Sequence, residues 1–370
     1  MRDKTVFVLL GHTVGGILSV YEVLIEELNK DRNFNIKILT YNYTFDNPNF
    51  FKNNELINIG VTPPIFLSNA FNFLWKLHRA LKKEKNKVLI INHPSVAILF
   101  SIYKFFFNVP FLLHVHEPIT PIISNKSYFS RVIYLAFLKL MLRNINEIVF
   151  VSSSLYEDYH SLCSIPKYTI VNNPINVIKI NFLAGLPIKI DPNNVNFVTV
   201  CRLTEAKGLF NLIAGFSLLK KKGIHNFKLR ILGDGELRGD LELMVSDHGL
   251  NSNIEFLGYI ENPYNYIKNS DCYVSSSLWE GFGLTILYAM LLKKPIIASK
   301  TKGAMELLNS TDSMYEVGDI QKLANLLENF LVNSEVFGHS IIPNYEKSLL
   351  YDVSYSINSF MKSVNNISKE

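Results

Sequence analysis

Short apolar runs alternate along the chain with longer segments of helical periodicity. In the first half, strand-like runs occupy 5–10, 34–41, 87–92, 110–115 and 147–153, and helical patterns occupy 15–30, 72–84, a segment from Ser95, and 128–143. Continuous apolar strands between helices are typical of a parallel sheet that helices cover on both faces. The first half therefore predicts a doubly wound α/β domain.

The pattern repeats after a polar, proline-bearing stretch at 170–194. Further strands are predicted at 196–201, 227–232, 253–259, 271–276 and 295–299, with a helix at 208–223 and a long tail helix at 346–367. We expect two Rossmann-like domains, residues 1–180 and 181–345, with the tail helix packing back on the first. Ligands bind outside the carboxyl ends of such strands, and two facing domains would form a cleft.

Net charge, cysteine spacing and the length of the apolar runs exclude several classes of protein. The chain has 370 residues, 19% of them charged, and a net charge of +5, which is a smaller excess than a dedicated nucleic-acid binder needs. Its three cysteines lie far apart without zinc-ligand spacing, which predicts reduced thiols and a cytoplasmic protein. The apolar stretch at 95–115 is interrupted by Lys104 and Pro110, and 132–142 is too short to span a bilayer, so we expect no transmembrane helix.

Four segments of the second domain follow strand ends and should meet at one edge of its sheet. Arg202 and Lys207 follow the strand at 196–201, the segment GDGELRG occupies 233–239, Ile260 follows the next strand, and Glu280 follows the strand at 271–276. The two cations suit a diphosphate. The helix predicted to begin near Gly283 offers free N–H groups to the same anion. Glu280 would accept hydrogen bonds from hydroxyl groups, and a sugar nucleotide carries both hydroxyls and a diphosphate.

Each of these residues alone has an ordinary alternative. Arg202 or Lys207 alone would be a surface ion-pair partner, GDG a strand-to-helix turn, and Glu280 a helix N-terminal charge. GDGELRG also resembles a dinucleotide fingerprint, which would indicate a nicotinamide enzyme. Its third glycine is one residue late, however, and the next strand ends in glycine instead of an acidic ribose ligand.

The first domain has two segments that are candidates for ligand binding. Gly15 and Gly16 end the loop GHTVGG after the first strand, where they allow either amide contacts to an anion or a plain turn. HVHEP ends a buried strand, and strand alternation puts His114 and His116 on one face. The pair could ligate a metal, although no third ligand is evident. His116 at the strand end more plausibly hydrogen-bonds a ligand.

The motifs together resemble those of the GT-B glycosyltransferases of glycosyltransferase family 4, over nearly the whole chain. The segments that carry the resemblance are RLTEAKGLFNLIAGF, LRILGDGELRGDL, IEFLGYI, SLWEGFGLTILYAMLLKKPIIAS, KGAMELL, the N-terminal GG and HVHE. The resemblance implies a metal-independent, retaining hexosyltransferase that uses a UDP- or GDP-linked sugar and no cofactor. It suggests bacterial surface polysaccharide assembly, such as O-antigen or capsule, with a saccharide or lipid-linked acceptor.

The resemblance also implies roles for particular residues. Arg202 and Lys207 match the diphosphate-binding pair, Glu280 the acid that contacts the donor sugar, and His116 the first-domain histidine at the reaction centre. The remaining donor-binding positions would be Gly15, Gly16, Gly233, Ile260, Gly283, Leu284, Thr285 and Tyr288.

Two positions depart from the family pattern. Cys201 stands where glycine is common, which is a small change. Tyr288 stands where the family has a second glutamate that grips the ribose hydroxyls. A phenol has one oxygen, and losing the charged hydrogen bond would cost about 1.5–3 kcal/mol. Tyr288 is the one support for an alternative, a catalytically silent GT-B protein that acts as a partner or scaffold.

A membrane contact is a further expectation for the first domain. The basic helix at 76–87 and the apolar, aromatic stretches near 102–111 and 132–142 suggest peripheral binding to anionic lipid at the inner face of the cell membrane. The alternative is a solvated helix with an ordinary core.

Overall fold

The computed structural model describes residues 4–10, 15–40, 54–60, 67–107, 109–124, 126–165 and 167–367. The chain divides into two compact units, Met1–Pro174 with Val353–Glu370 (unit 1) and Ile175–Asp352 (unit 2). The division lies six residues before the predicted boundary. The polar stretch at 170–194 contains a helix, α7 (Val177–Ala184), and the Asn262 side-chain amide of unit 2 donates to the Leu183 carbonyl at 2.9 Å. This contact ties α7 to unit 2.

Unit 1 is built on a seven-stranded parallel sheet in the order β3-β2-β1-β4-β5-β6-β7. Its strands are β1 (Lys4–Leu10), β2 (Phe34–Thr40), β3 (Glu55–Asn58), β4 (Lys87–Ile91), β5 (Phe111–Val115), β6 (Glu147–Phe150) and β7 (Tyr168–Ile170). The sequence pattern did not predict β3 and β7. Both are short strands at the sheet edges whose residues are all exposed or half-buried, so they lack a continuous apolar run.

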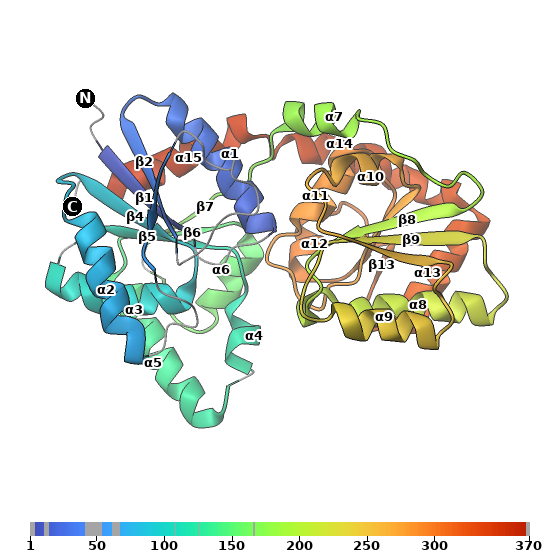
Figure 1. The fold of residues 1–370 in the computed structure, drawn as a ribbon, viewed down its shortest axis with the longest axis horizontal. Coiled ribbons are helices and arrows are strands. Elements are labelled where there is room, and N and C mark those ends of the chain that lie inside the picture. Colours follow the sequence, from blue (N-terminus) through green and yellow to red (C-terminus); the bar gives the residue numbers. More distant parts are fainter. Residues whose placement is uncertain are drawn as a thin grey trace. The chain divides into compact units, whose positions relative to one another are not determined.

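Helices cover both faces of this sheet (Figure 1). On one face α1 (Gly16–Lys30) packs beside α15 (Val353–Asn366), and the other face carries α2 (Leu67–Leu81), α3 (Pro94–Phe107) and α5 (Tyr128–Asn144). Two shorter helices, α4 (Ile119–Ser124) and α6 (Ser153–His160), follow β5 and β6. No helix in the described ranges is both long and apolar enough to cross a membrane.

Unit 2 has a six-stranded parallel sheet in the order β10-β9-β8-β11-β12-β13. Its strands are β8 (Val195–Val200), β9 (Phe227–Leu232), β10 (Ile254–Gly258), β11 (Cys272–Ser275), β12 (Ile296–Ser299) and β13 (Met314–Tyr315). One face packs against α8 (Leu209–Lys221), α9 (Arg238–Asp247) and α13 (Ile320–Val332), and α10 (Tyr264–Asn269), α11 (Leu284–Leu291) and α14 (Ile341–Leu349) lie on the other. A short helix, α12 (Lys302–Leu307), follows β12.

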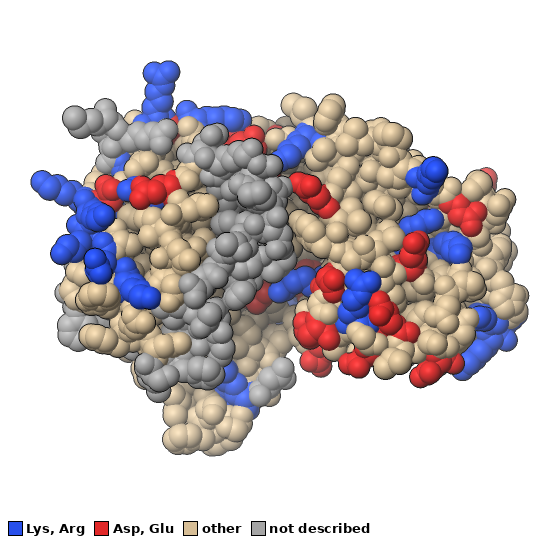
Figure 2. Space-filling view, in the orientation of Figure 1, with Lys and Arg blue, Asp and Glu red and all other residues tan. Residues whose placement is uncertain are grey.

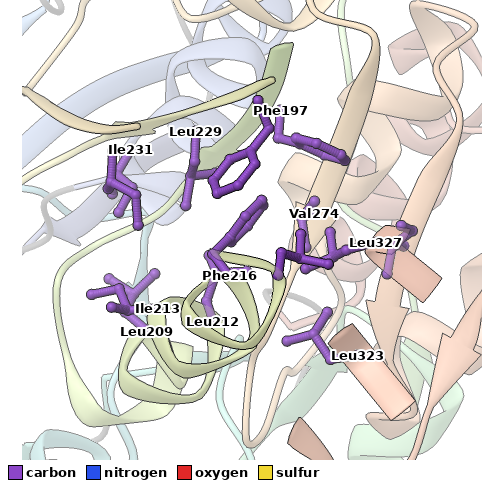
Figure 3. Close-up of a cluster of buried hydrophobic side chains, with 14 of the residues drawn as sticks. Phe197, Leu209, Leu212, Ile213, Phe216, Leu229, Ile231, Val274, Leu323 and Leu327 are labelled. Atoms are coloured by element: carbon purple, nitrogen blue, oxygen red, sulfur yellow. The ribbon is translucent and has the colours of Figure 1, made fainter. Parts of the chain in front are cut away.

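An apolar cluster fills the space between the unit 2 sheet and α8 (Figure 3). Phe197 on β8 meets Phe216 on α8 edge to face, with ring centroids 5.2 Å apart, and it also contacts Phe330 on α13. Leu323 and Leu327 of α13 close the cluster from the side. Because these side chains are fully buried, α8 and the loop that precedes it are held firmly against β8.

The tail does not form the single helix predicted at 346–367. It breaks at residues 350–352 into α14, which belongs to unit 2, and α15, which belongs to unit 1. At the break the backbone N–H of Ile175 donates to the Tyr351 carbonyl at 2.9 Å, and the N–H of Val177 donates to the Asp352 carboxylate at 3.2 Å. An uninterrupted helix would use the Tyr351 carbonyl internally, so pairing with the chain near residue 175 ends the helix here.

In both sheets the strand order reverses once, between β1 and β4 in unit 1 and between β8 and β11 in unit 2. Chain segments diverge at such a point and leave space for a ligand beyond the carboxyl ends of the strands. Because β10, β9, β8 and β11 are parallel neighbours, the four predicted strand-end segments do meet at one edge, which confirms that expectation.

Gly233, directly after β9, is required by the close packing of this edge. Its φ is 130°, and an added Cβ would lie 1.9 Å from the Cys201 carbonyl oxygen. We expect Gly233→Ala to lower the free energy of unfolding of unit 2 by more than the roughly 1–3 kcal/mol that a strained φ costs alone. Gly239→Ala is the matched control, because nothing lies within 4 Å of its added Cβ and alanine favours the α9 helix. Urea unfolding followed by circular dichroism compares the two, and equal midpoints would contradict the packing argument.

Candidate functional site

The central feature of unit 2 is an ion pair at the point where its strand order reverses. Lys207 follows β8 and Glu280 follows β11, and the Lys207 ammonium donates to Glu280 Oε2 at 2.7 Å. The Ser277 hydroxyl donates to the same oxygen at 3.1 Å. Both of these hydrogen bonds, the ones found among the described residues, are made to Oε2 and not to Oε1.

Backbone contacts fix the two loops that carry this pair. The Ser276 hydroxyl donates to the Lys207 carbonyl at 2.8 Å, and the Leu278 N–H donates to the Ala206 carbonyl at 2.8 Å. Between them Gly208 adopts a φ of 57°, and an added Cβ would lie 2.2 Å from the Ser276 carbonyl oxygen. The loops after β8 and β11 therefore form one rigid piece, and only glycine permits the approach.

The ion pair controls the charge of Lys207. Burial lowers its pKa, but attraction to and hydrogen bonding with Glu280 outweigh burial and leave the pKa above its usual value. Nearby, burial raises the pKa of the Cys201 thiol to about 11, which keeps that thiol neutral. Arg202, the neighbour of Cys201, is exposed. The loop after β8 therefore presents two cations and no thiolate.

The helix α11 begins beside this pair, as the sequence predicted. Gly283 is its N-cap with a left-handed φ of 93°, and no side chain caps the helix start. The N–H groups of the first turn consequently remain for a ligand. Gly303 supports the approach of this loop, since an added Cβ would lie 2.9 Å from the Glu280 carbonyl oxygen.

The side chains of the first two residues of α11 are used within the protein. Leu284 is buried, and the Thr285 hydroxyl accepts from the Tyr273 hydroxyl at 2.7 Å. Both residues can thus offer a ligand their backbone N–H.

Tyr288 lies on the second turn of α11 and is 6% exposed. Its ring meets the ring of Tyr264 on α10 edge to face, with centroids 4.9 Å apart. Tyr264 was not singled out from the sequence, since a lone tyrosine after a short polar loop gives no signal. Ile260, after β10, is half-buried at the same edge of the sheet.

Gly233 and Gly235 primarily serve packing, which was the ordinary alternative for the GDG segment. Their added Cβ atoms would meet the carbonyl oxygens of Cys201 and Leu203 at 1.9 and 2.5 Å. A role for Gly233 in binding a donor stays a prediction.

In unit 1 the predicted histidines lie on one face of the sheet with their rings 4.1 Å apart, which confirms the strand alternation. The Tyr21 hydroxyl from α1 and His114 Nδ1 share a hydrogen bond of 3.1 Å, and Phe360 from α15 packs on the His114 ring. His114 is thus committed to the core. His116 Nε2 is buried and has no hydrogen-bond partner in the described structure.

Burial makes both rings neutral at physiological pH. It lowers the pKa of His116 to about 3 and that of His114 well below its usual value. A neutral imidazole can donate to or accept from a ligand hydroxyl through Nε2. In the described ranges no group of three His, Cys, Asp or Glu side chains could hold a metal ion.

Other residues near this edge of the unit 1 sheet were missed from the sequence. Asn92 Nδ2, after β4, and Asn173 Oδ1, after β7, are buried without a hydrogen-bond partner in the described ranges, as is His116 Nε2. Asparagines in polar loops are ordinary turn residues, and only burial distinguishes these two. Gly15 caps α1 with a φ of 87° and Gly16 opens that helix. Residues 11–14 of the predicted glycine loop lie outside the described residues.

Buried neutral histidines make the stability of unit 1 depend on pH. The unfolded chain binds a proton at His116 below about pH 6.5, whereas the folded unit does not until about pH 3, so stability is lost as the pH falls through this window. At pH 5.5 the loss from one such histidine is about 1.4 kcal/mol. We expect His116→Gln to reduce the destabilisation between pH 7.5 and 5.5 by about this amount in urea titrations. The exposed His225→Gln should leave it unchanged, and the same reduction in both variants would refute the assignment.

Comparison with known proteins matches both units. The family model described as Glycosyltransferase Family 4 matches residues 14–179, and the model described as Glycosyl transferases group 1 matches residues 187–345. An uncharacterised glycosyltransferase of Methanocaldococcus jannaschii is 31% identical over 252 residues, which cover 63% of this chain and 61% of that relative. The capsular polysaccharide biosynthesis glycosyltransferase CapM of Staphylococcus aureus is 29% identical over 161 residues, 42% of this chain and 41% of CapM. The chain thus matches less than two thirds of the length of these relatives.

Solved structures share the fold. Anabaena HepE in complex with UDP-glucose superposes with a TM-score of 0.78 at 18% identity, over 98% of this chain and 99% of HepE. Sucrose-phosphate synthase from Thermosynechococcus elongatus gives a TM-score of 0.78 at 16% identity, over 99% of each chain. With the two family models matching most of its length, the chain belongs to the family 4 glycosyltransferases of the GT-B fold.

Proposed function

We propose that this protein is a retaining, metal-independent hexosyltransferase that uses a UDP- or GDP-linked sugar. The observation that carries the proposal is the Lys207–Glu280 pair beside the uncapped start of α11. The acceptor would be a saccharide or lipid-linked saccharide in bacterial surface polysaccharide assembly, such as O-antigen or capsule. The names of relatives such as CapM support this setting, and neighbours solved with UDP or UDP-glucose support the donor class.

The two charges of the pair suit the two chemical parts of the donor. Lys207, Arg202 and the first-turn N–H groups of α11 would neutralise the diphosphate as it departs. Glu280 would hold Lys207 through Oε2 and accept a sugar hydroxyl through Oε1. An acid next to an anion site then has a clear purpose, because it orients the cation and the sugar together.

The reaction would exchange one bond at the anomeric carbon for another on the same face. The bond from that carbon to the diphosphate oxygen breaks, the acceptor oxygen bonds to the carbon, and the hydroxyl proton passes to the departing phosphate oxygen. Retention of configuration follows from this geometry. His116, neutral and with Nε2 free of protein partners in the described ranges, would hydrogen-bond the transferred sugar. The acceptor would bind mainly on unit 1, in the cytoplasm or at the inner face of the membrane.

Lys207 and Arg202 are tested by removing each charge. We expect Lys207→Ala and Arg202→Ala each to lower kcat by about 10²–10³, because stabilisation of the leaving group is lost. Lys221→Ala, which removes an exposed cation at the far end of α8, is the control and should keep full activity. Release of nucleotide diphosphate from UDP- and GDP-sugars measures the rates, and melting curves establish that the variants fold. Normal rates in both site variants would end the assignment.

Tyr288 decides between an active enzyme and the catalytically silent alternative. We propose that Tyr288, whose ring packs against Tyr264, binds ribose with its single hydroxyl instead of the two oxygens of a carboxylate. This weakens nucleotide binding roughly 10- to 150-fold relative to a glutamate. The contribution of the two cations to the chemistry is unaffected.

Calorimetric titration with UDP and GDP tests this role of Tyr288. Tyr288→Glu should bind the cognate nucleotide as well as the wild type or better, and Tyr288→Ala should bind it more weakly. Tyr288→Phe, which keeps the contact with Tyr264, should lose about 2- to 13-fold, the value of one net hydrogen bond. If all three variants bind like the wild type, Tyr288 is not a ligand residue. If the wild type binds no nucleotide at all, the silent alternative replaces the enzyme.

A further inference from the structure

Helix α5 of unit 1 is apolar on its outer surface as well as on its inner one. Leu138, Met141 and Leu142 are buried against the unit. On the opposite side of the helix, Phe129, Ile133, Phe137 and Leu140 are 74%, 41%, 42% and 47% exposed. Their spacing of three to four residues places them in one stripe along the helix. A surface helix normally turns a polar face to solvent, so this stripe, here called the outer α5 stripe, is an unusual apolar surface among the described residues of unit 1.

The charged residues of the segment that contains the stripe have one sign. Residues 118–146 contain four basic side chains and no aspartate or glutamate, so this segment carries a formal charge of +4 out of the +5 of the whole chain. The basic residues are Lys126, Arg131, Lys139 and Arg143. Figure 2 agrees for the face that it shows: the end of unit 1 where α5 lies is tan and blue, without red.

We propose that the outer α5 stripe inserts into the interface of an anionic lipid bilayer. An apolar helical stripe bordered by cations is the pattern of a helix that lies in the plane of a membrane, with its apolar side chains below the headgroups and its basic side chains reaching up to them. Phe71 and Trp75 are also exposed, on α2, which covers the same face of the sheet. The sequence placed the basic part of this contact on the helix at 76–87 and the apolar part near 102–111 and 132–142. The structure moves the centre to residues 129–140.

Charge argues against a second copy of this chain as the occupant. A two-fold contact through the stripe would bring two +4 segments together with no carboxylate from residues 118–146 to pair with them. Lysine is also depleted in protein interfaces, whereas anionic lipid attracts each cation. Delivery of a lipid-linked acceptor by this contact rests on the proposed function, but binding to the bilayer itself does not.

Vesicle flotation tests the proposal with the full chain and no sugar donor. The wild type should bind vesicles of phosphatidylcholine with phosphatidylglycerol at low salt, and should bind poorly at high salt or to phosphatidylcholine alone. Phe129→Ser with Leu140→Ser should reduce the partition coefficient at least about tenfold. Lys139→Gln with Arg143→Gln should reduce it roughly fivefold for each charge.

The control is Leu243→Ser with Val332→Ser, which removes two exposed apolar side chains of unit 2 (64% and 81% exposed) and should bind vesicles like the wild type. All variants should keep the wild-type melting midpoint and nucleotide affinity, because the substituted side chains are exposed. Absence of wild-type binding, or equal binding by the Phe129/Leu140 variant, would overturn the proposal. The proposal would also be overturned if the wild type bound no vesicles and formed a dimer that the Phe129/Leu140 variant converts to a monomer. Loss of transferase activity alone would leave the proposal standing.

Discussion

All strands of a parallel sheet end at the same edge, and in unit 2 the strand order reverses between β8 and β11. This constraint brings together Lys207 and Glu280, which lie 73 residues apart in sequence. Everything else at the site depends on it. The glycines let the loops touch, the serine hydroxyls fix them, and the start of α11 adds its free N–H groups. A cation and an acid held at 2.7 Å form a pair that is neutral overall but strongly polar.

The strands of unit 1 also end at one edge of a parallel sheet, but the polar groups at that edge are of another kind. There the carboxyl edge of the sheet carries buried polar atoms that lack protein partners instead of a charged pair, among them His116 Nε2, Asn92 Nδ2 and Asn173 Oδ1 in the described ranges. Burial keeps His116 neutral, and Tyr21 occupies His114. Hydrogen bonding without charge suits sugar hydroxyls, and charge suits a diphosphate. The polar groups at the sheet edge are thus neutral in unit 1 and charged in unit 2.

Packing in the core of unit 1 does not explain the apolar side chains on the outer surface of α5. Apolar side chains on this helix outnumber those that its inner face can bury, and the surplus forms a stripe with basic neighbours. Packing within the unit explains Leu138, Met141 and Leu142 but not Phe129 or Leu140. The proposed contact with anionic lipid would account for the stripe, because the charged side chains of residues 118–146 are all basic.

The sequence by itself determined the two doubly wound units, most strands and helices, and the residues at the strand ends, because period-2 and period-3.6 apolar patterns and left-handed glycines are local properties. It did not reveal the short edge strands β3 and β7, because their exposed and half-buried residues form no continuous apolar run. It placed one helix at 346–367, where pairing of Ile175 and Val177 with Tyr351 and Asp352 breaks the chain into two. Only the tertiary structure showed that Tyr21 hydrogen-bonds His114, gave Glu280 its partners and placed Tyr288 against Tyr264. Those outcomes depend on which side chains burial and packing bring together across distant parts of the chain.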